Sequence, residues 1–304
     1  MNILFAGIGG VGGYFGGVLA QHYQGGENVK ISFLARGKHL EKIQTKGLQI
    51  KHNETIRVAK PFAASNEAKT LGPMDIVFLS TKSYDVADTA KSLAPCISSN
   101  TKIITLLNGV DSLNIIREIY PHNEVLNGCV YILSKIESPG VIHNFGQVQK
   151  MFFGRDHQDI TDLKPLEQIL LDAGLDVVLT DSILETTWTK FVFISGVGSC
   201  TSYFDEVLGA ILEDSEKKEV LTQLLEEVSH LGRALGVELD NDIVEITLGR
   251  LSKLPFDTTS SMQRDFRNGG KTEVESQTGY VLAQGSELGM HLPTYEMVFS
   301  KLNS

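Results

Sequence analysis

Short apolar runs alternate with longer amphipathic segments over the first part of the chain. Four runs have the length and composition of buried parallel strands: residues 2–6, 29–35, 75–80 and 102–107. Helix-length segments follow three of these runs, at residues 13–21, 84–94 and 112–120. Residues 47–59 alternate around an Asn-Glu turn, which predicts a β-hairpin. Strands separated by helix-length segments predict a doubly wound parallel sheet.

After Asp181 the pattern changes to helical periodicity. Within residues 213–236, apolar positions such as Leu221, Leu224 and Leu231 lie on one stripe of a helix, and Gly236 is placed to end it. Further helix-like segments lie at residues 240–253 and 272–288. We therefore expect an α/β domain over residues 1–180 and an all-helical domain over residues 181–304.

Composition narrows the class of protein. The 304 residues include 27 basic and 37 acidic side chains, for a net charge of −10, which argues against a nucleic-acid or anionic-membrane binder. The three cysteines, Cys96, Cys129 and Cys200, have no disulfide or zinc spacing, and the eight histidines show no metal-ligand pairing. No apolar run reaches the roughly 18–20 residues of a membrane helix, and the N-terminus lacks a signal-peptide pattern. We expect a cytoplasmic protein without a metal.

A glycine-rich segment lies between the first predicted strand and the helix after it. In this context glycines allow a tight turn (Gly7), close approach of the backbone to a pyrophosphate (Gly9) and packing of helix on strand (Gly12). The helix N-terminus also offers unpaired N–H groups to phosphates. A glycine turn without a ligand is the weaker alternative. The segment predicts a dinucleotide-binding loop made by Gly7, Ile8, Gly9, Gly10, Val11 and Gly12.

The residue after the second predicted strand indicates which dinucleotide is bound. NAD-binding proteins usually have Asp or Glu there, to hold the ribose 2′-hydroxyl. This chain has Arg36, whose guanidinium could bind a 2′-phosphate with two hydrogen bonds. The alternative is a solvated loop arginine. Arg36 therefore favours NADPH over NADH.

Three polar residues occur where catalytic groups are often found. Lys190 lies in an otherwise apolar segment (WTKFVFI), and burial would lower its pKa towards the range useful for acid catalysis. A lysine that extends its ammonium to water is the more common alternative. Lys82 and Asn108 each follow a predicted strand, at the edge where ligands gather in open α/β sheets. Each alone is more often an ordinary turn residue, but together they are expected to surround one crevice.

Several short motifs, in this order and spacing, resemble the ketopantoate reductase family (2-dehydropantoate 2-reductases) over nearly the whole chain. They are GIGGVGG at 7–13, LAR at 34–36, TKS at 81–83, LNG at 107–109, SPGVIH at 138–143, WTKF at 188–191, SSM at 260–262 and KTE at 271–273. The resemblance implies an N-terminal Rossmann-type domain that binds NADPH, and a 2-oxo acid held in a cleft against the helical domain.

The resemblance also implies roles for individual residues. Lys190 corresponds to the general acid that protonates the keto oxygen, and its charge would stabilise the developing alkoxide. Lys82 corresponds to a lysine that contacts the cofactor, and Asn108 to an asparagine between nicotinamide and substrate. Ser261 corresponds to a serine that binds the substrate carboxylate. Glu273 corresponds to an acidic residue that contacts the cofactor near the lysine.

Two positions depart from the family pattern. Four and eight residues after the catalytic lysine the family usually has asparagines that hydrogen-bond the substrate, whereas this chain has Ile194 and Gly198. Loss of such partners weakens discrimination between substrates. Nearby hydroxyl groups are candidates to replace them: Ser195, Ser199, Thr201 and Ser202.

The expected function is NADPH-dependent reduction of a 2-oxo acid, by default 2-dehydropantoate (ketopantoate) to pantoate in pantothenate and coenzyme A biosynthesis. The small-molecule substrate is the expected partner, and a homodimer is one open alternative for assembly. Ile194 and Gly198 leave two other functions open. One is a reductase of a different, more apolar 2-oxo acid, and the other is a dinucleotide-binding regulator with little turnover.

Overall fold

The computed structural model describes residues 1–303, and the chain divides into two compact units. The first comprises Met1–Leu107 and Ser112–Ile183, and the second comprises the segment Asn108–Asp111 together with the chain from Leu184 onward. The short segment that follows the strand at 102–105 therefore groups with the C-terminal unit, although its neighbours on both sides belong to the first.

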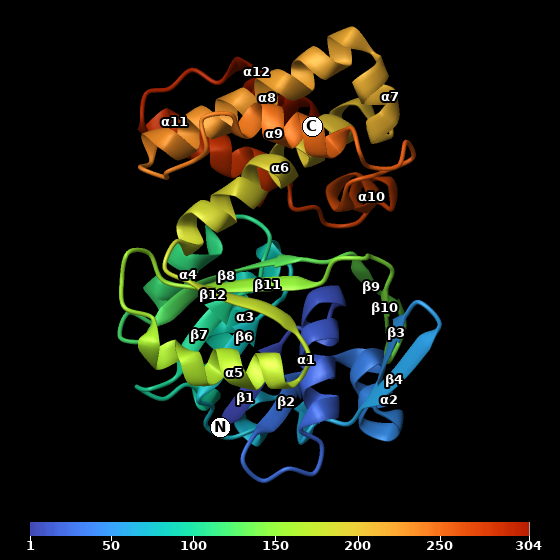
Figure 1. The fold of residues 1–304 in the computed structure, drawn as a ribbon, viewed down its shortest axis with the longest axis vertical. Helices are drawn as coiled ribbons and strands as arrows, with labels where there is room; N and C mark the ends of the chain where they lie inside the picture. Colours follow the sequence, from blue (N-terminus) through green and yellow to red (C-terminus); the bar gives the residue numbers. More distant parts are fainter. Residues whose placement is uncertain (304) are drawn as a thin grey trace. The chain divides into compact units, whose positions relative to one another are not determined.

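An eight-stranded sheet forms the centre of the first unit (Figure 1). Its strands are β1 (Asn2–Ala6), β2 (Lys30–Leu34), β5 (Ala63–Ser65), β6 (Ile76–Leu79), β7 (Lys102–Thr105), β8 (Val125–Tyr131), β11 (Lys150–Gly154) and β12 (Asp176–Thr180). The strand order is β12-β11-β8-β7-β6-β1-β2-β5, and every neighbouring pair is parallel except β8 and β11. The four predicted strands and the doubly wound α/β class are confirmed.

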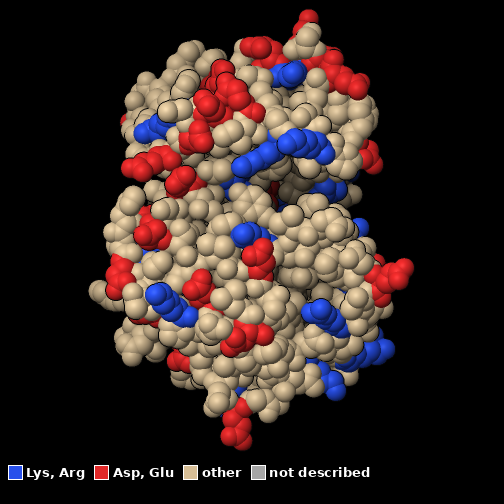
Figure 2. All heavy atoms as spheres, viewed as in Figure 1, with Lys and Arg blue, Asp and Glu red and all other residues tan. Residues whose placement is uncertain are grey.

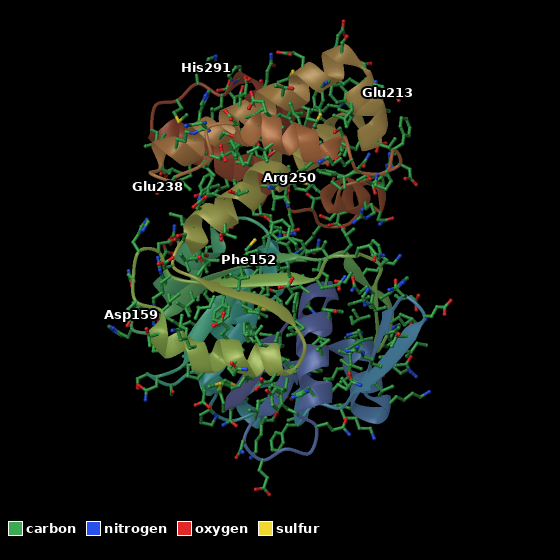
Figure 3. All side chains as sticks on the ribbon, viewed as in Figure 1. Phe152, Asp159, Glu213, Glu238, Arg250 and His291 are labelled. Carbon is green, nitrogen blue, oxygen red and sulfur yellow. The ribbon has the colours of Figure 1, made fainter. Side chains whose placement is uncertain are left out.

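Helices cover both faces of this sheet because its strands alternate between two apolar sides. On β1, Ile3 and Phe5 join the core that includes α1 (Gly10–His22), α2 (Gly37–Lys46) and α5 (Lys164–Asp172). Leu4 and Ala6 point to the other core, with α3 (Val86–Ser92) and α4 (Ser112–Ile119). On β11, Met151 and Phe153 are fully buried, while Phe152 between them is half-buried and packs edge-on against Tyr131 (Figure 3). This two-sided burial is why the strands appear as continuous apolar runs.

A second sheet of four strands packs against α1. Its order is β4-β3-β10-β9, from β4 (Thr55–Ala59), β3 (Leu48–His52), β10 (Val141–Asn144) and β9 (Ser134–Ser138). The predicted hairpin at 47–59 is confirmed as β3 and β4, but its parallel partner β10 lies ninety residues away and was not expected. Gly13 and Gly17 let the sheet approach, since a Cβ there would lie 2.6 Å from Ile142 and Ile50 respectively.

The second unit contains no strand among its described residues. Its long helices are α6 (Ile183–Phe204), α8 (Ser215–Ala234) and α12 (Pro293–Leu302), and its shorter ones are α7 (Leu208–Glu213), α9 (Ile243–Leu251), α10 (Ser261–Arg267) and α11 (Tyr280–Glu287). A π-helical turn, η5 (Glu275–Gly279), leads directly into α11. The expected all-helical C-terminal domain is confirmed.

The helix expected over residues 213–236 is confirmed as α8, which begins directly after Asp214. That side chain accepts hydrogen bonds from the backbone N–H groups of Glu216 (3.0 Å) and Lys217 (3.1 Å), so it caps α8 and separates it from α7. The predicted apolar stripe of α8 is confirmed, because Leu221, Leu224, Leu225, Val228 and Leu231 are completely buried.

Surface charge is distributed rather than concentrated over the first unit. On the face drawn in Figure 2, its acidic and basic side chains lie interspersed. Within the described residues, no helix combines the length and hydropathy needed to cross a bilayer.

Candidate functional site

The glycine-rich segment turns sharply after β1 and leaves open space above one of its residues. Gly7 has a φ of +97°, and its carbonyl oxygen accepts a hydrogen bond of 2.8 Å from Ser80 Oγ, just after β6. A side chain at Gly12 would collide with that carbonyl oxygen, so Gly12 allows α1 to pack on the loop. A Cβ on Gly9 would meet nothing within 4 Å. The loop is therefore tight at Gly7 and Gly12 and open at Gly9.

The start of α1 suits an anion. Gly9 is the N-cap and makes no side-chain hydrogen bond to the first turn, which contains no acidic residue. Ile8 is buried, whereas Gly9, Gly10 and Val11 are partly exposed. Backbone N–H groups without side-chain caps, at the positive end of a 13-residue helix, favour a phosphate. The loop thus fits the pyrophosphate of a dinucleotide.

Two further predicted cofactor residues, Arg36 and Lys82, follow the strands on either side of β1. Arg36 follows β2 as the N-cap of α2, and Lys82 follows β6 as the N-cap of the short helix η2 (Ser83–Asp85). Because β6, β1 and β2 are adjacent and parallel, their carboxyl ends meet at one edge of the sheet. Arg36 Nη2 lies 2.9 Å from Asp85 Oδ2, a partner that sequence reasoning did not identify.

In the second unit, Lys190 and Asn108 form a direct contact. Lys190 Nζ donates a hydrogen bond of 2.8 Å to Asn108 Oδ1, across 82 positions of the chain. Lys190 is half-buried on α6, and its neighbours Trp188 and Phe191 are buried. Asn108 belongs to the short segment that groups with the helices, which explains how it reaches Lys190. The structure therefore brings together the two residues predicted at the centre of the chemistry.

Aromatic rings hold this part of α6 in place. Trp188 and Phe191 pack against each other and both contact Tyr280 of α11, with ring centroids 6.4 Å and 5.9 Å from the tyrosine. Burial raises the pKa of Tyr280 to about 12, and the negative charge of Asp111 acts in the same direction. The phenol is therefore neutral at physiological pH.

Ser261 and Glu273 lie in the same unit on separate elements. Ser261 begins α10, immediately after the N-cap Ser260, whose hydroxyl accepts a hydrogen bond of 2.8 Å from Thr201 on α6. Glu273 is 4% exposed and precedes the π-helical turn, where its carbonyl oxygen accepts from the Gln277 N–H at 3.1 Å. Both predicted residues thus belong to the helical unit.

Three hydroxyl groups suggested as replacements for the missing asparagines already have partners inside the bundle. Ser195 Oγ lies 2.7 Å from Tyr295 Oη, and Ser199 Oγ lies 2.8 Å from Thr278 Oγ1. Thr201 bonds Ser260 and its own helix, whereas the buried Ser202 Oγ has no hydrogen-bond partner among residues 1–303. Ser195, Ser199 and Thr201 therefore hold helices together.

Comparison with known proteins extends these observations to the whole chain. Residues 3–157 match the family described as "Ketopantoate reductase PanE/ApbA", and residues 182–304 match its C-terminal domain. The "uncharacterized oxidoreductase YkpB" of Bacillus subtilis is 28% identical over 99% of this chain and 98% of its own. A crystal structure of 2-dehydropantoate 2-reductase from Porphyromonas gingivalis is 31% identical, with a TM-score of 0.88 over 100% of this chain and 99% of that one.

A more distant structure shows the same fold. It is D-mandelate dehydrogenase with NADH and anilino(oxo)acetate, at 20% identity and a TM-score of 0.86, with 99% of this chain and 96% of that chain covered. The two family matches and the full-length relative at 31% identity establish which family the chain belongs to. The chain belongs to the ketopantoate reductase family, whose members are dinucleotide-dependent oxidoreductases acting on 2-oxo and 2-hydroxy acids.

Proposed function

We propose that the protein reduces a 2-oxo acid to the 2-hydroxy acid with NADPH, and that its substrate is 2-dehydropantoate, which becomes pantoate for coenzyme A synthesis. The observation that carries this proposal is the 2.8 Å hydrogen bond from Lys190 to Asn108. It holds an ammonium group in a defined position on a helix whose adjacent residues are buried. Such a group can both donate a proton and stabilise a developing negative charge.

Lys190 acts as the general acid. When bound, NADPH supplies the hydride that adds to the keto carbon. The Lys190 ammonium donates one proton to the keto oxygen, which becomes the hydroxyl of the product, and the resulting neutral amine regains a proton from solvent. Asn108 accepts a hydrogen bond from the ammonium and so fixes its direction.

The remaining predicted residues have binding roles. In this proposal the loop Gly7–Gly12 holds the pyrophosphate over the open space at Gly9, and Arg36 binds the 2′-phosphate. Lys82 and Glu273 contact the cofactor, and Ser261 binds the substrate carboxylate. The first unit is thus the NADP-binding domain, and the helical unit carries the catalytic residues.

A different 2-oxo acid is the second candidate substrate. Ile194 is half-buried one turn from Lys190, where an apolar side chain suits an apolar substrate. D-mandelate dehydrogenase, which shares the fold, was crystallised with an oxo acid other than 2-dehydropantoate. A regulator that binds a dinucleotide without turnover is disfavoured, because such a protein has no need of the Lys190–Asn108 pair.

The test is oxidation of NADPH by the purified protein with 2-dehydropantoate and a panel of branched and linear 2-oxo acids, compared with Lys190→Ala. We expect turnover of 2-dehydropantoate that the substitution lowers by about 10²-fold or more. Faster turnover of another 2-oxo acid would keep the mechanism and change the substrate. Tight NADPH binding without any turnover would indicate the regulator.

We also propose that the protein works in the reducing cytoplasm. The three free cysteines are buried, and burial raises the pKa of the Cys200 thiol to about 12. Assembly as a homodimer belongs to the same proposal and is tested by measuring the mass of the purified protein in solution.

A further inference from the structure

The absence of a side chain at Gly198 makes room for the amide of Gln277. A Cβ on Gly198 would lie 2.9 Å from Gln277 Oε1 and 3.2 Å from the terminal methyl of Met262. The first distance is shorter than van der Waals contact allows. Any residue other than glycine at position 198 would therefore push this amide away, so the two positions depend on each other.

Gln277 is buried, and only its backbone is hydrogen-bonded. The residue is 2% exposed; its N–H donates to Glu273 O at 3.1 Å, and its carbonyl oxygen accepts from Ser195 Oγ at 3.2 Å. The hydrogen bonds of Gln277 within residues 1–303 are thus made by its backbone and leave its side-chain amide for other contacts. Neither polar atom of the amide is completely enclosed, so a ligand can reach the group.

Gly198, the residue beside the amide, lies two turns along α6 from Lys190. Positions 190, 194 and 198 are spaced by four residues and form one ridge along the helix, with Lys190 at one end and Gly198 at the other. Gln277 reaches this ridge from the π-helical turn η5, four residues after Glu273. Such turns widen a helix locally and occur frequently at functional sites.

We propose that Gln277 is a specificity-determining residue, whose amide hydrogen-bonds a hydroxyl group on the side chain of the 2-oxo acid. The proposal rests on the reductase function above. A primary amide presents a donor and an acceptor together, which matches a hydroxyl group. The favoured substrates are therefore hydroxylated 2-oxo acids such as 2-dehydropantoate, despite the apolar Ile194 and the missing side chain at Gly198. In this protein the amide that contacts the substrate is carried by η5, whereas the family's asparagines are four and eight residues after the lysine, on α6.

The test compares kcat/KM for 2-dehydropantoate with that for the analogue that lacks the terminal hydroxyl. We expect the wild-type protein to prefer the hydroxylated acid, and Gln277→Leu to lower that preference roughly tenfold by acting on 2-dehydropantoate alone. Gln284→Leu, the same change one helix further on, is the matched control and is expected to leave the preference intact. Melting temperatures of all variants report whether they fold.

Two further variants separate the role of the amide from its effect on packing. Gly198→Ala displaces the amide without removing it and is expected to lower the same preference. The double variant Gly198→Asn with Gln277→Leu places an amide at the same end of the ridge, now carried by α6. We expect it to regain part of the preference for 2-dehydropantoate. We expect the affinity for pantoate in the presence of NADP, measured by calorimetry, to rank the variants in the same order as their preference for 2-dehydropantoate.

Two results would overturn the role of Gln277 while leaving the reductase proposal in place. One is a wild-type protein that reduces both acids equally well. The other is a preference that Gln277→Leu and Gly198→Ala both leave unchanged. If the wild-type protein reduces no 2-oxo acid at all, the proposed function itself fails.

Discussion

Arg36 and Asp85 form an ion pair, with 2.9 Å between Arg36 Nη2 and Asp85 Oδ2, at the edge of the sheet where β2 and β6 end. The arginine side chain is 86% exposed and that of the aspartate 29%. Exposed pairs of this kind contribute little to stability, so the guanidinium is free to exchange partners. Asp85 is therefore a competitor for the 2′-phosphate that Arg36 is proposed to bind.

Arg36→Ala is expected to weaken NADPH binding by roughly tenfold or more and NADH binding little, because only NADPH carries the 2′-phosphate. Fluorescence titration of both cofactors measures the two dissociation constants. Lys38→Ala, two residues on, is the matched control for loss of a nearby positive charge. Equal losses for the two cofactors would show that Arg36 does not contact the phosphate.

Asp85→Asn should act in the opposite direction. Removing the carboxylate beside Arg36 removes both its competitor and a negative charge that repels the phosphate, so we expect NADPH to bind several-fold more tightly. NADH affinity should change little or fall. The same titration at low and high salt checks the cause, since the gain should shrink as salt screens the charges. Weaker NADPH binding by this variant would instead assign Asp85 a direct contact with the cofactor.

Two glycines of the same loop are expected to respond differently to alanine. Gly9→Ala places a methyl group in open space, so the melting temperature should hold while dinucleotide affinity falls. Gly12→Ala drives a methyl group into the Gly7 carbonyl oxygen and should lower stability by about 1–3 kcal/mol. Thermal unfolding and cofactor titration of both variants distinguish the effects. Unaltered affinity of Gly9→Ala would contradict a pyrophosphate at that position.

Asn108→Ala should lower kcat with little change in the melting temperature, because it removes the acceptor that orients the Lys190 ammonium. A loss of about tenfold or more is expected. Steady-state kinetics of this variant are compared with those of Asn114→Ala, an exposed asparagine on α4. If both variants keep full kcat, the Lys190–Asn108 hydrogen bond has no part in catalysis.

Stability at low pH should depend on Asp162. Its carboxylate accepts hydrogen bonds from Arg155 at 2.5 Å and 3.0 Å and lies 3.1 Å from Lys102 Nζ. Arg155 foremost, and then Lys102, hold the pKa of Asp162 well below its usual range, although burial opposes them.

A lowered pKa in the folded state stabilises the protein above the unfolded pKa of about 3.9, and this contribution is lost as the pH falls further. Urea unfolding between about pH 5 and pH 2 should show a steeper decline for the wild-type protein than for Asp162→Asn. The difference should be modest, because the side chain is half exposed. Parallel declines would show that the ion pairs of Asp162 make no measurable contribution to stability.

The local pattern of apolar and polar residues was sufficient to predict most of the fold. Apolar runs predicted β1, β2, β6 and β7, and a helical stripe predicted α8. Only the β3–β4 hairpin of the second sheet was predicted. Its pairing with β10 was not, because the two strands are far apart in the sequence and neither strand's own pattern specifies the partner. The expected helix over residues 213–236 differs only at its ends, because Asp214 caps α8 and the helix begins at Ser215.

For the site, motifs and their spacing identify the chemical groups that are present. Motif and spacing mark these residues: Gly7 to Gly12, Arg36, Lys82, Asn108, Lys190, Ser261 and Glu273. Which of these groups come into contact is known from the folded chain alone. It paired Lys190 with Asn108, gave Arg36 an acidic partner, engaged Ser195 and Ser199 inside the bundle, and placed Gln277 against Gly198. Hydrogen bonds and steric fit depend on distances of a few ångströms between segments that lie far apart in the chain, and spacing along the sequence does not encode such distances.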